Sequence, residues 1–454
     1  MPPFDVIPHP SYQQDSSQQH LHLMPWDFMF RLVIIGALIA AFLLSVHWRV
    51  FQPLLRTAQE HQWTRFIVSP SILWMLMGFS MLLFRTLLWF RYRTPPIAAF
   101  VDAPNMTVII PAYNEGPMVS QSIHSVATSH YPHGRLEIFV VDDGSQDDTW
   151  EHIEAAAKRF PGLVTTLRFP KNRGKRAALE AGFRHARGDV IVTIDSDSVI
   201  ERDTLLAMAG PFRDPKIGAV AGRVAVYNRG QGLIPRMLKV RYTLSFDYIR
   251  AVQSTYGTVC CCPGALAGYR ASIVRSVLDR WVNQKFMGVA CTYGEDRSMT
   301  NYILAQGYDT LYQRAAVVHT IVPLTYARLC KMFLRWDRSY VREEIRFARI
   351  VWKRPPVARA IAISDAIVSN LRYPIGWAAL GLLAAIIFWH PATLLRFLCV
   401  IGIMAAFNML YYLRSERSWD FVYGIFYSYY SAFALFWIFP YAVLTVRAKS
   451  WLTR

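Results

Sequence analysis

The stretch DVIVTIDSDS (189–198) decides the fold of this chain. Its first half is a short apolar run, typical of a strand that is buried on both faces of a parallel sheet. Two carboxylates, Asp195 and Asp197, follow that strand at once. Open α/β sheets bind ligands at the carboxyl ends of their strands, so the stretch predicts an α/β domain with a site at this edge.

The same alternation of strands and helices precedes this stretch. Hydrophobic patterns predict strands at 107–111, 136–141 and 163–168, and helices at 117–129, 149–159 and 175–186. Asp142 and Asp143 lie just past the second of these strands, in the same way that Asp195 lies just past the strand at 189–194. Asp-Gly is also an ordinary turn signal, so the recurrence of carboxylates at two strand ends is what indicates a site.

These carboxylates suit the chemistry of a diphosphate. A diphosphate leaving group needs its charge neutralised, usually by a divalent cation with hard oxygen ligands. Asp195 and Asp197 are two residues apart, so an extended chain points both to one face, where they could share that cation. Lys175 and Arg176 begin the predicted helix after Gly174, where the helix dipole also favours a phosphate. The alternative for these two cations is a solvated helix start.

Two later motifs are further candidates, GEDR (294–297) and RW (335–336). Asp296 is the predicted general base that removes a proton from an acceptor hydroxyl. Glu295 is the competing base, and a Glu-Asp pair before an apolar helix is also a good capping sequence. Arg335 and Trp336 offer a cation for the diphosphate and an aromatic face for a sugar; the alternative for Trp336 is an interfacial tryptophan.

The apolar residues of the chain are clustered into long segments. Hydrophobic residues make up 53% of the chain, and the mean hydropathy is +0.21. Candidate membrane segments lie at 32–48, 67–90, 373–389, 394–413 and 421–446. The first begins too deep in the chain for a signal peptide and lacks a small-residue cleavage site. The sequence therefore predicts an integral membrane protein.

These segments divide the chain into six predicted parts. The first three are a disordered tail, two transmembrane helices and the α/β domain, at 1–27, 28–93 and 94–325. The last three are basic amphipathic interfacial helices, further transmembrane or interfacial helices and a cytoplasmic tail, at 326–359, 360–446 and 447–454. Segment 421–446 is rich in Tyr and broken at Pro440, which favours a partly interfacial or re-entrant segment and four full spans. Five spans are the alternative.

The net charge is +18, and many of the basic residues lie beside the apolar segments. The chain has no recognisable nucleic-acid module, so nucleic acid is not an expected partner. The positive-inside rule instead predicts a multi-pass protein of the cell membrane with a cytoplasmic α/β domain, and Arg85 close enough to the end of its span to snorkel. Basic residues recur every three or four positions from Arg328 to Lys353, which predicts one basic stripe on an interfacial helix ended by Pro355. Such a face favours anionic lipids and sugar nucleotides.

The cysteines show no zinc-binding spacing. They are Cys260, Cys261, Cys262, Cys291, Cys330 and Cys399. Cysteines that face the cytoplasm should stay reduced. The run from Cys260 to Cys262 is interpreted as packing rather than as nucleophiles.

Three longer stretches carry a family resemblance. They are TVCCCPGALAGYR (258–270), GEDRSMTNYILAQGYDTLYQ (294–313) and RWDRSYVRE (335–343). Over about residues 100–350 the chain resembles the processive family 2 glycosyltransferases, in particular hyaluronan synthases and the chitin synthase-like rhizobial chito-oligosaccharide synthases. The resemblance implies a GT-A fold between transmembrane helices. Met332 departs from the family motif QxxRW, which has Gln at that position.

The resemblance also implies roles for individual residues. Those implied to contact the nucleotide or its diphosphate are Ala112, Tyr113, Glu115, Asp143, Lys175, Arg176 and Asp195. Asp195 and Asp197 would also hold Mg²⁺ or Mn²⁺, and Asp296 would be the base. Those implied at the acceptor or the pore entrance are Cys262, Glu295, Arg297, Arg335 and Trp336. The terminal WLTR is similar to a family motif that folds over bound nucleotide, which would bring Trp451 and Arg454 to the donor.

The implied activity is inverting and processive transfer from a UDP-sugar, with GlcNAc, GlcA or both, to a growing β-linked polysaccharide that leaves through a membrane pore. One alternative is a non-processive family 2 transferase that acts on a lipid carrier. Another is a synthase of the cellulose or poly-N-acetylglucosamine type. From a different class, the chain could be a transport or scaffold subunit with an inactive transferase domain. The sequence leaves the sugar and the oligomeric state open.

Overall fold

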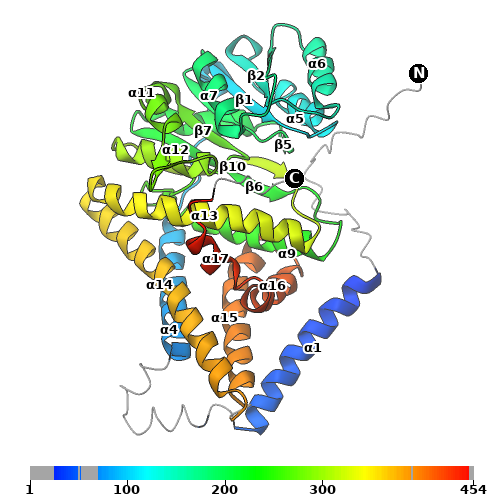
Figure 1. Cartoon of the computed structure of the whole chain (residues 1–454), viewed down its shortest axis with the longest axis vertical. Helices are drawn as coiled ribbons and strands as arrows, with labels where there is room; N and C mark the ends of the chain where they lie inside the picture. The colour runs from blue at the N-terminus through cyan, green and yellow to red at the C-terminus, as the bar shows by residue number, and fades with distance from the viewer. Residues whose placement is uncertain (1–24, 50–51, 53–69, 390–391, 449–454) are drawn as a thin grey trace.

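The structure, a computed structural model, describes residues 25–49, 52, 70–389 and 392–448. An α/β domain lies at one end of the molecule, and long helices run from it toward the other end (Figure 1). One helix, α13 (Tyr326–Ile350), lies across the boundary between these two parts.

The domain is built on an eight-stranded sheet with the strand order β3-β2-β1-β4-β7-β6-β10-β5. The strands are β1 (Met106–Ala112), β2 (Leu136–Asp142), β3 (Val164–Arg168), β4 (Val190–Thr193), β5 (Ser198–Ile200), β6 (Ile217–Val226), β7 (Ala267–Arg270) and β10 (Asp309–Thr320). The first four in the sheet are parallel, as predicted. Strand β7 runs antiparallel to both of its neighbours, and β5 runs antiparallel to β10, so the whole sheet is mixed.

Helices cover both faces of this sheet. They are α5 (Met118–Ala127), α6 (Thr149–Arg159), α7 (Lys175–His185), α8 (Thr204–Ala209), α9 (Leu233–Tyr242), α10 (Ile249–Ser254), α11 (Ala271–Val282) and α12 (Glu295–Ala305). All seven residues of β1 are buried. Val108 and Ile110 belong to the cluster that includes α5, and Ile109 belongs to the cluster that includes α7. A strand covered on both faces needs apolar side chains at nearly every position, which is the pattern that predicted it.

The remaining helices surround and extend below α13. They are α1 (Pro25–His47), α4 (Pro70–Arg91), α14 (Pro356–Ile386), α15 (Ala392–Glu416), α16 (Phe421–Phe433) and α17 (Ile438–Leu444). Figure 1 shows α1, α4, α14 and α15 running away from the domain, whereas the short helices α16 and α17 stay close below α13. Helix α13 ends at Ile350, a short turn follows to Lys353, and α14 begins at Pro356. The break between the two helices therefore lies where Pro355 predicted it.

Two helices of the described residues are long and apolar enough to cross a membrane, Phe28–His47 and Ala392–Glu416. The pair α16 and α17 would be a third if counted together, but it is bent by 48°. The break lies between Phe433 and Ile438, ahead of Pro440. The described helices therefore supply two or three candidate spans, and the four or five predicted from the sequence are not confirmed.

Three cations behave differently from their prediction. Arg85 on α4, expected to snorkel, donates from Nε to Asp365 of α14 at 2.9 Å. Within the basic stripe on α13, Arg338 and Arg342 are buried rather than exposed. Arg338 donates to Oγ1 of Thr445, at 3.1 and 2.9 Å. A spacing of three and four residues shows that side chains share a helix face, but it does not show whether protein covers that face.

Candidate active site

The loops that follow β1 and β2 form one wall at the carboxyl edge of the sheet. The N–H of Asn114 donates to Oγ of Ser145 at 3.0 Å, and the N–H groups of Glu115 and Gly116 both donate to Oγ1 of Thr149 at 2.8 Å. These hydrogen bonds fix the backbone that carries the predicted nucleotide contacts. Of those contacts, Ala112 is buried, whereas Tyr113 and Glu115 are partly exposed. Their contact with a nucleotide stays a prediction.

Asp143 shapes the loop that leads into α7. Its two carboxylate oxygens accept hydrogen bonds from the N–H groups of Arg173 and Gly174, at 2.7 and 2.8 Å. Burial raises the pKa of Asp143, and these backbone hydrogen bonds act in the opposite direction. Asp143 therefore holds the N-terminus of α7 at the sheet edge, and its predicted place near the uridine stays untested.

Lys175 is the centre of the site. Its ammonium contacts Asp195, which follows β4, and Nζ lies 3.8 Å from Oε1 of Glu295 at the start of α12. Burial alone would lower the pKa of Lys175, but the carboxylates of Asp195, Glu295 and Asp296 raise it above its usual range. The site therefore contains a permanent positive charge among three carboxylates.

Backbone N–H groups hold the carboxylate of Asp296 from both sides. Its Oδ2 accepts from the N–H of Gly264 at 3.2 Å, and its Oδ1 accepts from the N–H of Arg297 at 2.7 Å. The thiol of Cys261 lies 3.6 Å from the same Oδ2. Asp296 sits in the first turn of α12, after Gly294 with a φ of +74°. The sharp turn at this glycine directs the start of the helix, and so Asp296, toward Lys175.

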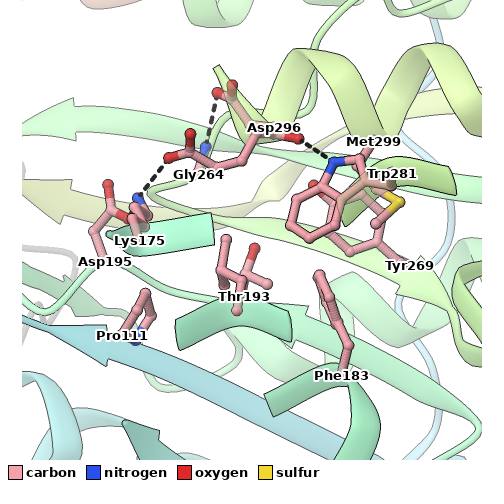
Figure 2. A pocket seen from close by; sticks show the side chains of 12 residues that line it. Pro111, Lys175, Phe183, Thr193, Asp195, Gly264, Tyr269, Trp281, Asp296 and Met299 are labelled. Atoms are coloured by element: carbon pink, nitrogen blue, oxygen red, sulfur yellow. Dashed lines mark hydrogen bonds and ion pairs between the residues drawn. The ribbon is translucent and has the colours of Figure 1, made fainter. Parts of the chain in front are cut away.

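A pocket joins these residues (Figure 2). It is lined by Pro111, Lys175, Leu179, Phe183, Thr193, Asp195, Gly264, Tyr269, Trp281, Glu295, Asp296 and Met299. Figure 2 shows Lys175, Asp195 and Asp296 at one end and Phe183, Trp281 and Tyr269 around the other. The charged end of the pocket therefore combines carboxylates and an ammonium at the sheet edge where the sequence predicted a site.

The loop after β4 carries the two carboxylates that were predicted to hold a metal, Asp195 and Asp197. Asp195 contacts Lys175, and Oδ1 of Asp197 accepts from Oγ1 of Thr320 at 3.2 Å. In the described part of the chain, no group of three or more His, Cys, Asp or Glu side chains is arranged to hold a metal ion. Two carboxylates fit Mg²⁺ or Mn²⁺ nevertheless, because Mg²⁺ commonly takes one or two protein carboxylates and completes its shell with substrate phosphates and water.

Arg176 does not lie where the sequence predicted it. Its side chain is buried, its Nη1 donates to the carbonyl of Trp281 at 2.6 Å, and its guanidinium lies 4.6 Å from the centre of the Trp281 ring. Burial lowers the pKa of Arg176. Lys175 faces the pocket, and the next residue along the helix points into the core, so Arg176 supports α11 instead of contacting a diphosphate.

Two residues predicted on the acceptor side are also buried. Cys262 is fully buried, and its N–H donates to Oγ1 of Thr300 at 3.0 Å. Burial raises the pKa of the Cys260 and Cys262 thiols to about 12, so both stay protonated, as packing requires. All six cysteines are free. Glu295 is buried too, and its carboxylate faces Lys175 rather than the acceptor side.

The other residues predicted on the acceptor side lie on or against α13. Arg297 pairs with Glu344 of α13, and Arg335 is partly exposed on the same helix. Trp336 lies in an aromatic cluster, with ring centres 6.1 Å from Tyr242, 6.2 Å from Phe246 and 5.7 Å from Phe333. Met332, the departure from the family motif, is buried with its sulfur 4.0 Å from the Tyr242 hydroxyl.

Some residues of the site were not predicted. Gly264 contacts Asp296 and faces Lys175, and the only sequence signal for it is the Pro-Gly pair after the cysteines. Tyr242 and Phe246 contact Trp336 from a helical segment whose sequence has no motif that would mark it as part of a site. Trp451 and Arg454 lie outside the described residues, so their predicted role remains a prediction.

Comparison with known proteins agrees with this geometry. Residues 107–278 match the family model described as glycosyl transferase family 2. An N-acetylglucosaminyltransferase of Rhizobium meliloti (strain 1021) is 33% identical over 359 residues, which cover 77% of this chain and 82% of the relative. This chain belongs to glycosyl transferase family 2. The resemblance seen in the motifs is thereby confirmed.

A second relative supports the family assignment, and a solved structure supports the fold. An N-acetylglucosaminyltransferase of Rhizobium sp. (strain N33) is 32% identical over 358 residues, 77% of each protein. The solved structure of mannosyltransferase PcManGT from Pyrobaculum calidifontis, in complex with GDP-Man and Mn²⁺, superposes with a TM-score of 0.57 at 22% identity, covering 80% of this chain and 97% of that one. This family 2 protein is a nucleotide-sugar-dependent glycosyltransferase with a GT-A-like fold.

Proposed function

We propose that this family 2 enzyme is an inverting, processive N-acetylglucosaminyltransferase that polymerises sugar from UDP-GlcNAc into a β-linked chain and passes the chain across the membrane. One observation carries the proposal: Asp296, fixed by two backbone N–H groups, lies with Lys175 and Asp195 around one pocket. The names of the rhizobial relatives favour GlcNAc as the sugar.

The proposed step is a single displacement. Asp296 takes the proton from the terminal hydroxyl of the acceptor, and that oxygen forms a bond to the anomeric carbon of the donor sugar. The bond from the anomeric carbon to the β-phosphate oxygen breaks, and UDP leaves with the electron pair. Attack from the face opposite UDP converts an α-linked donor into a β-linked product. Lys175 neutralises part of the charge that develops on the diphosphate.

A divalent cation completes the donor site in this proposal. Asp195 and Asp197 would hold Mg²⁺ or Mn²⁺, which neutralises negative charge on the diphosphate when bound. Because Lys175 contacts Asp195 in the structure, the ammonium stands beside the proposed metal ligand and can assist the same phosphate oxygens. The Mn²⁺ bound to the mannosyltransferase of the same fold supports divalent metal use in such a domain.

The contact between α12 and α13 supports processive transfer. A Cβ at Gly294 would lie 1.9 Å from Oγ of Ser339, so the start of α12, which carries Asp296, touches α13, which carries Trp336. Trp336 and Phe246, which are both partly exposed, offer flat apolar faces of the kind on which sugar rings stack. Directly beyond α13 are the long apolar helices, which are the proposed path for the polymer.

The proposed location is the cell membrane, with the catalytic domain on the cytoplasmic side where sugar nucleotides occur. The two candidate spans and the bent pair α16 and α17 are compatible with this arrangement. Membrane lipids would contact these helices, and a growing polysaccharide would be the second partner.

The test is a panel of radiolabelled UDP-sugars with the purified protein in nanodiscs, followed by digestion of the product. The proposal predicts incorporation from UDP-GlcNAc into a ladder that chitinase degrades. A requirement for UDP-GlcA, together with a product that hyaluronidase digests, would show that the proposed sugar is wrong. A product with a single sugar on an extractable lipid would show that the enzyme transfers to a lipid carrier and does not polymerise. No UDP release from any donor would contradict an active transferase.

A further inference from the structure

Arg297 connects the proposed base to α13 through both its backbone and its side chain. Its N–H donates to Oδ1 of Asp296 at 2.7 Å, and its Nη2 pairs with Oε1 of Glu344. The guanidinium also lies over the ring of Tyr340, 4.6 Å from the ring centre. A change in the position of Arg297 therefore moves one of the donors that fix the base.

Glu344 extends this connection to α14. Its Oε2 accepts from Nδ2 of Asn370 at 3.1 Å, while Oδ1 of Asn370 accepts from the Tyr340 hydroxyl at 3.1 Å. Arg297, Tyr340, Glu344 and Asn370 thus form a closed set of contacts from three helices, here called the Arg297 cluster. The cluster lies where the base helix, the helix with Trp336 and the long apolar helix α14 meet.

The Arg297 cluster is well enclosed. The side chains of Arg297 and Glu344 are 13% and 15% exposed. Charge-assisted hydrogen bonds in such a site are stronger than those of surface pairs, and loss of one partner leaves the other charge poorly solvated. Burial alone would lower the pKa of Arg297, but Glu344 keeps it above its usual range, so Arg297 stays charged.

The neighbouring residue Glu343 has a different role. It is fully buried and accepts from Nε2 of Gln284 at 2.8 Å and from Nδ2 of Asn301 at 3.0 Å. These contacts hold the body of α12 against α13 and are part of the core. Within α12, Glu344 instead contacts Arg297 in the first turn, directly beside Asp296, so its contact bears on the placement of the base.

We propose that Glu344 is a positioning residue: through Arg297 it holds Asp296 in line with the acceptor and links that placement to α14. The inference rests on the proposed function, in which Asp296 is the base. The donor contacts come from Lys175 and Asp195, which the Arg297 cluster does not touch. Loss of Glu344 should therefore slow the chemical step while donor binding is kept.

The test compares steady-state UDP release from UDP-GlcNAc by the full-length protein and by the variants Glu344→Ala, Glu344→Gln and Asn370→Ala. A displacement of about 1 Å in a reacting group can cost roughly a hundredfold, so we expect kcat to fall about 30-fold for Glu344→Ala, with KM for UDP-GlcNAc within about twofold. Glu344→Gln keeps an oxygen for Arg297 and should retain more of kcat. Asn370→Ala should lower kcat to a smaller extent.

The matched control is Glu180→Gln, which also removes the charge from a Glu–Arg pair, between Glu180 and Arg184 on α7 at 2.9 Å. That pair lies on the surface and should leave kcat and KM unchanged. Thermal unfolding in detergent identifies any variant that fails to fold, and Glu344→Gln serves if Glu344→Ala does. Wild-type kcat in a folded Glu344→Ala protein, or a rise in KM with unchanged kcat, would overturn the inference. A wild-type enzyme that releases no UDP would instead contradict the proposed function.

Discussion

The main-chain N–H of Gly264 lies 3.2 Å from Oδ2 of Asp296, and the same glycine leaves room for Lys175 on its other side. A Cβ at this position would lie 3.1 Å from Nζ of Lys175 and 3.5 Å from Oδ1 of Asp195. One residue without a side chain therefore allows the proposed base, the ammonium and the proposed metal ligand to share one pocket.

Gly264→Ala should lower the rate of UDP release while the protein stays folded. The added methyl group displaces the flexible end of Lys175 rather than any backbone, so the melting temperature should change little. We expect kcat/KM for UDP-GlcNAc to fall roughly tenfold, about 1.4 kcal/mol of transition-state stabilisation. Gly134→Ala is the matched control because a Cβ there meets nothing within 4 Å. Equal rates for the two variants would show that Gly264 does not shape the site.

Removal of divalent metal should stop UDP release. EDTA treatment should abolish activity, and added Mn²⁺ or Mg²⁺ should restore it. Asp197→Asn should raise the metal concentration that gives half-maximal activity by about tenfold or more, since a neutral amide is a weaker ligand for a hard cation. Asp279→Asn, whose side chain is 80% exposed, controls for the loss of a charge. Full activity after exhaustive chelation would count against a metal at these carboxylates.

Trp336→Ala should shorten the polymer. Removal of the indole opens a gap among Tyr242, Phe246 and Phe333, and an aromatic contact of this kind contributes about 0.5–1.5 kcal/mol. Product length on a gel should fall, and Trp336→Phe should restore part of it. Trp352→Ala is the control, because Trp352 is 63% exposed. An unchanged ladder would remove Trp336 from the acceptor path.

Asp337→Asn should stabilise the protein more at pH 8 than at pH 5. Burial raises the pKa of Asp337 to about 7, against the opposing effect of Arg241 and Arg372. The folded protein therefore holds a proton at Asp337 that the unfolded chain releases near pH 4, and stability from this group falls as the pH rises from about 4 to 7. Melting temperatures of both proteins at the two pH values measure the effect. An equal difference at both values would mean that Asp337 titrates normally.

Much of the first half of the sheet could be predicted from the sequence because β1, β2 and β4 are covered on both faces. β2 and β4 are mostly apolar, and their ends place Asp142 and Asp195 without any long-range information. The second half could not be predicted in this way. β7 has only four residues and lies antiparallel between β4 and β6, an order that depends on packing far along the chain.

The candidate site could likewise be predicted only in part. Lys175, Asp195 and Asp296 carry chemistry in their side chains at element ends, and the structure brings them together. Arg176 has the same charge as Lys175 and lies beside it, yet it faces Trp281 in the core, because successive helical residues point about 100° apart. Sequence motifs cannot show that difference unless the face of the helix that meets the core is already known.

UDP release by purified Asp296→Asn supplied with UDP-GlcNAc is the sharpest test of Asp296 as the base. The substitution keeps the shape of the side chain and removes its ability to accept the acceptor proton. We expect a loss of about a hundredfold to ten-thousandfold in kcat, with an unchanged melting temperature and with Glu295→Gln less affected. Polymer synthesis by Asp296→Asn at the wild-type rate would contradict this assignment of the base.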